Sequence, residues 1–381
     1  MSLVLNEDQL MLQQSARDFC REQAPVAVLR RMRDSEDRNG YPAQLWQSMV
    51  ALGWAGMAIP EAYGGFDFGY SGLGLVLEET GRTLVPTPLV STVLLSATVI
   101  NLAGSEAQKT QLLPGIASGE SVMALALEET AIHNPLHIEL KAVKNGSGYM
   151  LHGDKQFVLD ANVAGHFIVV ARTDGETGHQ EGISLFVVDS ASKGIQVQRL
   201  NMVDSRNAGN VSFVDVAVSA DALLGEEGKG WAALSRTLDI GRIGLAAEML
   251  GGVQEVFERT VEYMKQRSQF GVQIGAFQAL QHRAAIMYSE IELCKSLVLK
   301  ALHELDRGEE AEDLPALASM CKAKLSEVYM LVSNEGVQMH GGIGMTDEFD
   351  IGFFMKRARV AQQTLGDAAF HRDRYASLRR F

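Results

Sequence analysis

Arg267-Ser268-Gln269-Phe270-Gly271 closes a long stretch of helical spacing and is the part of the chain that decides its fold. The run joins a guanidinium and an amide to an aromatic side chain and a glycine. Arg267 offers a forked pair of donors that suits a pyrophosphate. Gly271 lets the backbone approach an anionic ligand where a Cβ would collide. The run therefore indicates a site for a phosphate-containing cofactor.

A second run, Gln338-Met339-His340-Gly341-Gly342-Ile343-Gly344, follows further along the chain. Together the two runs resemble the flavin-binding signature of the acyl-CoA dehydrogenase family, whereas a Rossmann fingerprint is absent. The resemblance implies bound FAD, which two groups of residues would contact. Contacts from across a dimer interface would come from Arg267, Gln269 and Phe270. Contacts to the pyrophosphate and ribose region of FAD would come from Gln338, Gly341 and Gly342.

Composition narrows the class of protein. The 381 residues are 46% hydrophobic and 21% charged, as in a globular chain of two or three domains. The net charge of −13 argues against nucleic-acid binding. Cys20, Cys294 and Cys321 are widely separated, and neither they nor the histidines have metal-ligand spacing, which favours a reducing compartment and no metal. The most apolar run, residues 88–104, is too short and too hydroxylated to cross a bilayer, and no signal peptide is evident. We expect a cytoplasmic protein without membrane contact.

Three compositional zones divide the chain. Residues 1–120 have helical spacing broken by prolines and glycines, residues 121–228 form short β-rich runs, and residues 229–381 return to longer helical segments. This order predicts an α+β multi-domain protein with an N-terminal helical domain, a central antiparallel β domain and a C-terminal four-helix bundle. The resemblance implies the same order and covers essentially the whole chain. Gly81-Arg82 and Pro86-Thr87-Pro88 are similar to a branch that includes small subunits of two-subunit acyl-CoA dehydrogenases.

The β zone departs from the family pattern at both segments that usually face the flavin. Leu127 replaces a threonine whose hydroxyl could bond the isoalloxazine ring. Phe157-Val158-Leu159 stands where the family commonly has Trp-Ile-Thr. Phe157 can still stack on a ring system, but Leu159 cannot donate a hydrogen bond. These three residues can equally be ordinary strand core. We still expect FAD, with altered tuning.

The reaction that the resemblance implies needs a carboxylate to remove the proton α to a thioester. Most family members carry a glutamate where this chain has Leu365. A minority carry it on the first bundle helix just before an arginine, where this chain has Gly241 followed by Arg242. Both usual bases are therefore absent. Arg242 could act near the thioester or belong to an ordinary ion pair.

Two other carboxylates are candidate bases. Asp367 follows a glycine and could reach inward, although an aspartate there is also a good cap for the last helix. Glu248 lies about two helical turns past Gly241 on the same face. Its apolar surroundings could raise its pKa for base chemistry, or it could belong to a buried salt bridge.

The resemblance implies FAD-dependent α,β-dehydrogenation of an acyl-CoA thioester, with electrons passed to an electron-transfer flavoprotein. The substrate would have an unusual shape, such as a dicarboxylyl or alicyclic CoA ester. As an alternative, the chain is a non-catalytic partner subunit that builds half of a site. A flavin oxidase or monooxygenase on the same fold is a third possibility. In each case we expect a homodimer, a homotetramer or a heterotetramer with a homologous chain, because Arg267 and Gln338 would serve a neighbouring subunit's flavin.

Overall fold

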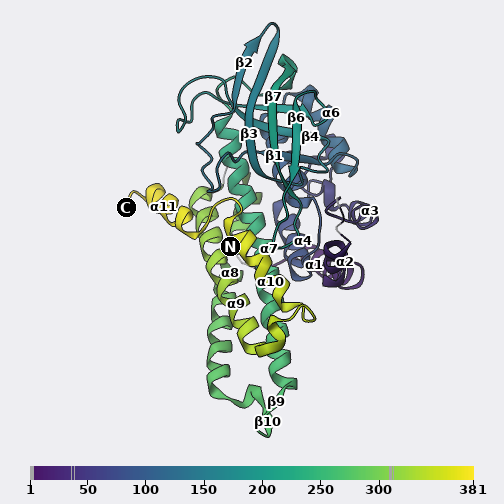
Figure 1. Ribbon diagram of the computed structural model, residues 1–381, viewed down its shortest axis with the longest axis vertical. Helices are drawn as coiled ribbons and strands as arrows, with labels where there is room; N and C mark the ends of the chain where they lie inside the picture. The colour runs from purple at the N-terminus through teal and green to yellow at the C-terminus, as the bar shows by residue number, and fades with distance from the viewer. Residues whose placement is uncertain (1–3, 36, 38, 309–310, 312) are drawn as a thin grey trace. The chain divides into compact units, whose positions relative to one another are not determined.

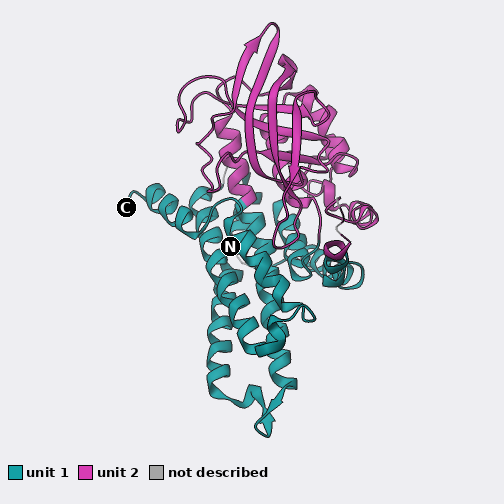
Figure 2. Ribbon diagram, viewed as in Figure 1, with its two compact units in different colours: residues 1–31, 70–85, 242–381 teal, residues 32–69, 86–241 magenta. Residues whose placement is uncertain are grey.

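The computed structural model describes residues 4–35, 37, 39–308, 311 and 313–381. They form two compact units, which Figure 2 colours separately. Unit 1 comprises residues 1–31, 70–85 and 242–381, and unit 2 comprises residues 32–69 and 86–241. Each unit is therefore built from segments that lie far apart in the sequence.

Unit 1 is helical. Its centre is α9 (Leu314–His340), which packs against α8 (Gln278–Asp306), α10 (Ile351–Gln363) and α11 (Ala368–Arg379), as Figure 1 shows. The unit also contains α1 (Glu7–Gln23), residues 242–266 of α7 (Trp231–Gln266), and most of α2 (Val26–Asp34) and α4 (Gly69–Arg82). Buried apolar side chains occur at helical spacing along α9, because each neighbouring helix covers part of its surface. The predicted helical C-terminal domain is confirmed.

Side chains in the sequence set where these helices begin. The Asn6 carboxamide oxygen accepts from the Gln9 backbone N–H at 2.8 Å, and the Gln9 side chain accepts from the Asn6 backbone N–H at 3.1 Å. This reciprocal pair satisfies two of the free N–H groups that open α1. At the other end of the chain, the Asp367 carboxylate accepts from the Phe370 N–H at 2.8 Å and caps α11.

Unit 2 contains an eight-stranded sheet in the order β6-β7-β3-β2-β4-β5-β8, with β1 paired to β4. Apart from β1 and one residue pair between β2 and β4, the pairing is antiparallel. The strands are β1 (Met123–Ala126), β2 (Lys141–Asn145), β3 (Gly148–Leu159), β4 (His166–Arg172), β5 (Ile183–Asp189), β6 (Ile195–Arg199), β7 (Ala208–Ser219) and β8 (Leu223–Leu224). The predicted central sheet is confirmed, with β1 as a parallel addition.

Unit 2 also contains α3 (Ala43–Ala51), α5 (Thr98–Ala103), α6 (Glu106–Ala117) and residues 231–241 of α7. A π-helical run, Leu89–Ala97, precedes α5 inside the apolar stretch. The Ser91 hydroxyl donates to Asp160 at 2.5 Å, and the Thr92 hydroxyl donates to the Met123 carbonyl at 2.9 Å. Two hydroxyls of this stretch thus make buried contacts, one to β1 and one to the residue that follows β3. None of the helices, over the residues described, is both long and apolar enough for a membrane crossing.

Candidate functional site

The predicted cofactor residues of unit 1 lie in two exposed turns. The first is a hairpin after α7, in which β9 (Ser268–Gln269) pairs with β10 (Val272–Gln273). Phe270 and Gly271 form its two-residue turn, with φ of 54° and 82°. Positive φ at both positions is the geometry of a type I′ turn, which matches the twist of the strands but strains a residue with a Cβ. The Phe270 side chain is 90% exposed.

Arg267 stands at the base of this hairpin, just after the end of α7. Its carbonyl accepts from the Ile274 N–H at 2.8 Å, which closes the hairpin. Its side chain is exposed and has no ion pair within the described part of the chain. Gln269, on β9, is exposed as well. A free guanidinium, an amide and an aromatic ring are therefore presented together on one short turn.

The second turn follows α9, where Gly341 has φ of 65°. A Cβ at Gly341 or at Gly342 would meet no atom within 4 Å, so the backbone here faces open space. Gln338, in the last turn of α9, is also exposed. The surface thus offers backbone and amide donors to a ligand or to a second chain.

His340 differs from its glycine neighbours because it is buried. Its Nδ1 donates to the Gly336 carbonyl at 2.7 Å, and its ring stacks on Tyr263 with centroids 4.4 Å apart. Burial lowers the pKa of the imidazole and so favours its neutral form. The ring therefore has a packing and backbone-bonding role at the end of α9.

The cofactor candidates of unit 2 occupy two different environments. Leu127 is buried, and its carbonyl accepts from the Lys155 ammonium at 3.0 Å. Lys155 also pairs with Glu129 at 2.7 Å, and burial lowers the pKa of this lysine. Val158 belongs to the sheet core, so it fits the strand-core interpretation, while Leu159 is partly buried. Flavin contact by these residues stays a prediction.

Phe157 is the exception among them. The pairing of β3 with β7 shifts register between Lys155 and Val158, which marks a β-bulge. Phe157 lies in the bulge with φ of 51°, and its N–H donates to the Asn210 side chain at 3.2 Å. A bulge re-aims a side chain, and this one leaves the ring 43% exposed. An exposed aromatic ring held in a strained conformation is a candidate for ring stacking.

The positions of the two usual bases lie on α7 and in the connector 364–367 between α10 and α11. Leu365 is buried and has φ of 59°, which is unusual for a branched residue. Its carbonyl accepts from Arg242 Nε at 3.3 Å and from His371 Nε2 at 3.0 Å. Arg242 also lies over the Phe370 ring at 5.6 Å. In unit 1, Arg242 therefore holds the connector.

The two alternative carboxylates are both engaged. Asp367 is half-buried, and one of its oxygens caps α11. Glu248 is buried on α7 and accepts from Arg357 on α10 at 3.1 Å. The cap and the buried salt bridge, each foreseen as the ordinary role, are present. Whether either carboxylate also removes a proton stays a prediction.

Sequence reasoning missed Lys322, which is completely buried on α9 and donates to carbonyls on either side of Leu365. It lies in no motif, because its partners are backbone atoms of another helix and of the connector. The only sequence signal available was a lysine at an apolar-face position of a long helix.

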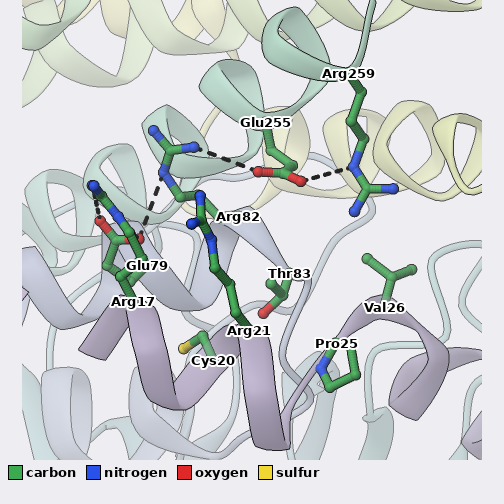
Figure 3. A pocket seen from close by; sticks show the side chains of 10 residues that line it. All are labelled: Arg17, Cys20, Arg21, Pro25, Val26, Glu79, Arg82, Thr83, Glu255 and Arg259. Atoms are coloured by element: carbon green, nitrogen blue, oxygen red, sulfur yellow. Dashed lines mark hydrogen bonds and ion pairs between the residues drawn. The ribbon is translucent and has the colours of Figure 1, made fainter. Parts of the chain in front are cut away.

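A small charged pocket of about 120 Å³ also lies within unit 1 (Figure 3). Glu79 lies between Arg17 at 2.8 Å and Arg82 at 3.6 Å, and Glu255 lies between Arg82 at 3.4 Å and Arg259 at 2.8 Å. Guanidinium and carboxylate groups alternate, so the charges compensate one another. The network links α1, α4 and α7 and contains none of the predicted site residues. Across the described residues, no three His, Cys, Asp or Glu side chains are grouped to hold a metal ion.

The residues present fit FAD. Open space over Gly341 and Gly342 leaves room for a diphosphate, and Arg267 has its donors available. Phe157 and Phe270 are exposed rings in units 2 and 1 respectively.

Three family models match the chain. They are described as the N-terminal, middle and C-terminal domains of acyl-CoA dehydrogenase and match residues 6–120, 126–216 and 228–377. Mitochondrial isovaleryl-CoA dehydrogenase of Pongo abelii is 31% identical, over 97% of this chain and 88% of that protein. The CarC subunit of the caffeyl-CoA reductase-Etf complex of Acetobacterium woodii is 29% identical, over 94% of both. The structure of butyryl-CoA dehydrogenase from Megasphaera elsdenii superposes with a TM-score of 0.92 at 30% identity, over 100% of both chains.

Proposed function

The chain belongs to the acyl-CoA dehydrogenase family of FAD-dependent oxidoreductases, and we propose that it forms a double bond between Cα and Cβ of a CoA thioester with Asp367 as the base. The observation that carries the activity is the pair of exposed turns at 267–271 and 338–344. They offer a free guanidinium and open glycine backbone in a chain whose family uses FAD. Electrons pass to an electron-transfer flavoprotein, in line with the Etf complex named for the Acetobacterium relative.

The chain's own residues have separate tasks in this proposal. FAD, when bound, accepts the hydride that leaves the β carbon. Arg267 holds the diphosphate through its forked donors, and Gly341 with Gly342 admits it to the backbone. Phe157 and Phe270 supply flat surfaces for aromatic rings.

Asp367 is favoured as the base because of its place and its free oxygen. It is the last residue of the connector that carries Leu365, and only one of its two carboxylate oxygens receives the N–H that caps α11. Glu248 is the second choice, because its pairing with Arg357 holds it inside the bundle of unit 1. A base must reach the proton it removes, so accessibility favours Asp367.

The test separates the base from the cap. Asn caps a helix about as well as Asp, so Asp367→Asn removes the base and retains the cap. The purified yellow protein is mixed anaerobically with each CoA ester of a panel, and the bleaching of the flavin absorbance is measured over time. The bleaching rate should fall roughly 10²- to 10⁴-fold in Asp367→Asn. Unchanged bleaching in that variant would show that Asp367 is not the base, and the same measurement on Glu248→Gln then tests the second choice.

The same experiment tests the assembly. We propose an oligomer in which Arg267 and Gln338 serve a neighbouring subunit's flavin. If none of the CoA esters bleaches the flavin of the pure chain, and bleaching occurs only after a homologous chain is added, the chain is a half-site partner subunit. The similarity of residues 81–82 and 86–88 to small subunits motivates that control. Oxygen consumption without a CoA ester would instead indicate an oxidase.

Three finer points also stay predictions. The substrate is expected to be a dicarboxylyl or alicyclic CoA ester, because the segments around Leu127 and Phe157 depart from the family pattern. The division of the chain into domains at residues 1–120, 121–228 and 229–381 is proposed from composition. A cytoplasmic location is proposed from the three thiols, all of which are free and buried.

A further inference from the structure

Lys322 is a fully buried lysine whose ammonium has an acceptor for each of its three hydrogens. Its Nζ donates to the Gly366 carbonyl at 2.7 Å, to the Gln362 carbonyl at 3.0 Å and to the Ser326 hydroxyl at 3.2 Å. The residue shows no exposed surface. A buried ammonium persists only when it is paired or fully hydrogen-bonded, and here backbone carbonyls supply most of those bonds.

The two carbonyls lie on either side of position 365. Gln362 is in the last turn of α10, where carbonyls lack a helical partner, and Gly366 is in the connector that leads to α11. Lys322 therefore joins the end of one helix to the segment before the next.

The connector needs such support because its backbone is strained. Leu365 and Gly366 have φ of 59° and 102° in succession. A left-handed leucine persists only when its surroundings determine it. Arg242 and His371 hold the Leu365 carbonyl, and Lys322 holds the carbonyls at 362 and 366. Donors from α7, α9 and α11 thus fix the segment from three sides.

Burial and nearby charges act on the protonation of Lys322. The pKa of the Lys322 ammonium is lowered to about 7, first by burial and second by the like charge of Arg242 on α7, while the Asp367 carboxylate ahead of α11 acts in the opposite direction. His371 on α11 shares the Leu365 carbonyl with Arg242, and α10 contributes a backbone carbonyl. Loss of the proton removes one of the three donors.

We propose that Lys322 is a positioning residue that sets the backbone of the connector 364–367 and, through it, the place of Asp367 relative to the substrate. The consequence for proton removal rests on the proposed function. The consequence for the connector does not, because it follows from the hydrogen bonds alone.

The experiment measures the connector and the reaction separately. Hydrogen–deuterium exchange of the backbone amides of residues 364–367 is compared in the wild type, Lys322→Met and Lys322→Gln. Lys324→Met is the matched control, because Lys324 is two residues along α9 and forms a partly exposed pair with Glu290. Exchange should be at least tenfold faster in Lys322→Met and intermediate in Lys322→Gln, which retains amide donors and serves if the methionine variant does not fold. It should be unchanged in Lys324→Met.

The reaction readout is the anaerobic bleaching of bound flavin by a CoA ester. The maximal bleaching rate should fall 10- to 100-fold in Lys322→Met, while the ester concentration at half-saturation stays within twofold. The maximal bleaching rate of the wild type should depend on pH around pH 7, and this pH dependence should be absent in Lys322→Met. Unchanged exchange at 364–367 overturns the proposal whatever the activity. Faster exchange with an unchanged bleaching rate overturns the positioning role. A wild type that no ester bleaches refutes the proposed function, and the exchange data then decide the connector by themselves.

Discussion

The hairpin at Phe270 and the connector at Leu365 place a bulky residue in the same left-handed backbone conformation by different means. In the hairpin, two short strands and a two-residue turn impose the conformation locally, and the ring remains 90% exposed. In the connector, side chains from three helices hold the backbone, and Leu365 is buried. The exposed turn leaves its donors and ring available to a ligand or another chain. In the buried turn, the backbone carbonyls accept hydrogen bonds that fix the position of the connector.

The largest effect is expected on the buried side, at the pair of Glu248 and Arg357. Arg357→Met leaves a buried carboxylate without its 3.1 Å partner. We expect a loss of roughly 3–5 kcal/mol in the free energy of unfolding, measured by urea denaturation. Glu290→Gln, which breaks the partly exposed pair with Lys324, should cost less than about 1 kcal/mol. Equal losses would mean that burial does not separate the two regions.

On the exposed side, Arg267→Gln should weaken FAD binding without weakening the fold. The side chain has no ion pair within the residues described, so the melting temperature of the cofactor-free protein should be unchanged. Loss of a charge-assisted contact of about 1.5–3 kcal/mol corresponds to an increase of roughly 10- to 100-fold in the Kd for FAD. Fluorescence titration with FAD measures it. A large fall in the melting temperature of the apoprotein would show that Arg267 is structural.

Lys322 should give the buried region a pH dependence that the hairpin lacks. Its folded-state pKa is lowered to about 7, so between about pH 7 and pH 10 the unfolded chain binds more protons at this residue than the folded one. The stability of the wild type should therefore rise with pH relative to Lys322→Met, by about 1 kcal/mol per pH unit. Urea denaturation of both proteins at several pH values tests this. A constant difference would mean that the lysine keeps its proton throughout.

The smallest effect is expected at the hairpin turn. Phe270→Asn places a residue that tolerates the left-handed conformation where φ is 54°. Relief of strain should raise the free energy of unfolding by up to about 1 kcal/mol, while FAD binding weakens because the ring is lost. Thermal unfolding and FAD titration on the same samples measure both. A fall in stability would mean that the exposed ring packs against the protein more than its surroundings indicate.

Local sequence signals were sufficient where one segment determines its own structure. The start of α1 at Asn6 and the cap of α11 at Asp367 follow from side chains that bond backbone groups three residues away. The sheet of unit 2 was readable from short β-rich runs between turn residues. Two features there were not foreseen, the parallel pairing of β1 with β4 and the π-helical run 89–97, because each depends on contacts far along the chain.

The candidate site divides in the same way. Arg267, Phe270 and the glycines at 341–342 could be proposed from the sequence because their chemistry lies in contiguous runs, and the exposed turns are compatible with that proposal. The hydrogen bonds that hold the connector could not be predicted from the sequence. Their donors, Lys322, Arg242 and His371, come from three helices, and their acceptors are backbone carbonyls. Every residue has a backbone carbonyl, so the residue types in the sequence do not indicate which carbonyl accepts a hydrogen bond.

The amino-acid sequence by itself determined the family, the helical and sheet regions, and the two runs that we propose as cofactor-binding, because each depends on residue type and spacing within one segment. Only the tertiary structure decided that Phe157 is turned outward by a bulge, that Glu248 is paired with Arg357, and that a buried lysine supports the segment around Leu365. Those features depend on which distant groups burial brings together, and on the requirement that every buried donor and charge finds a partner there.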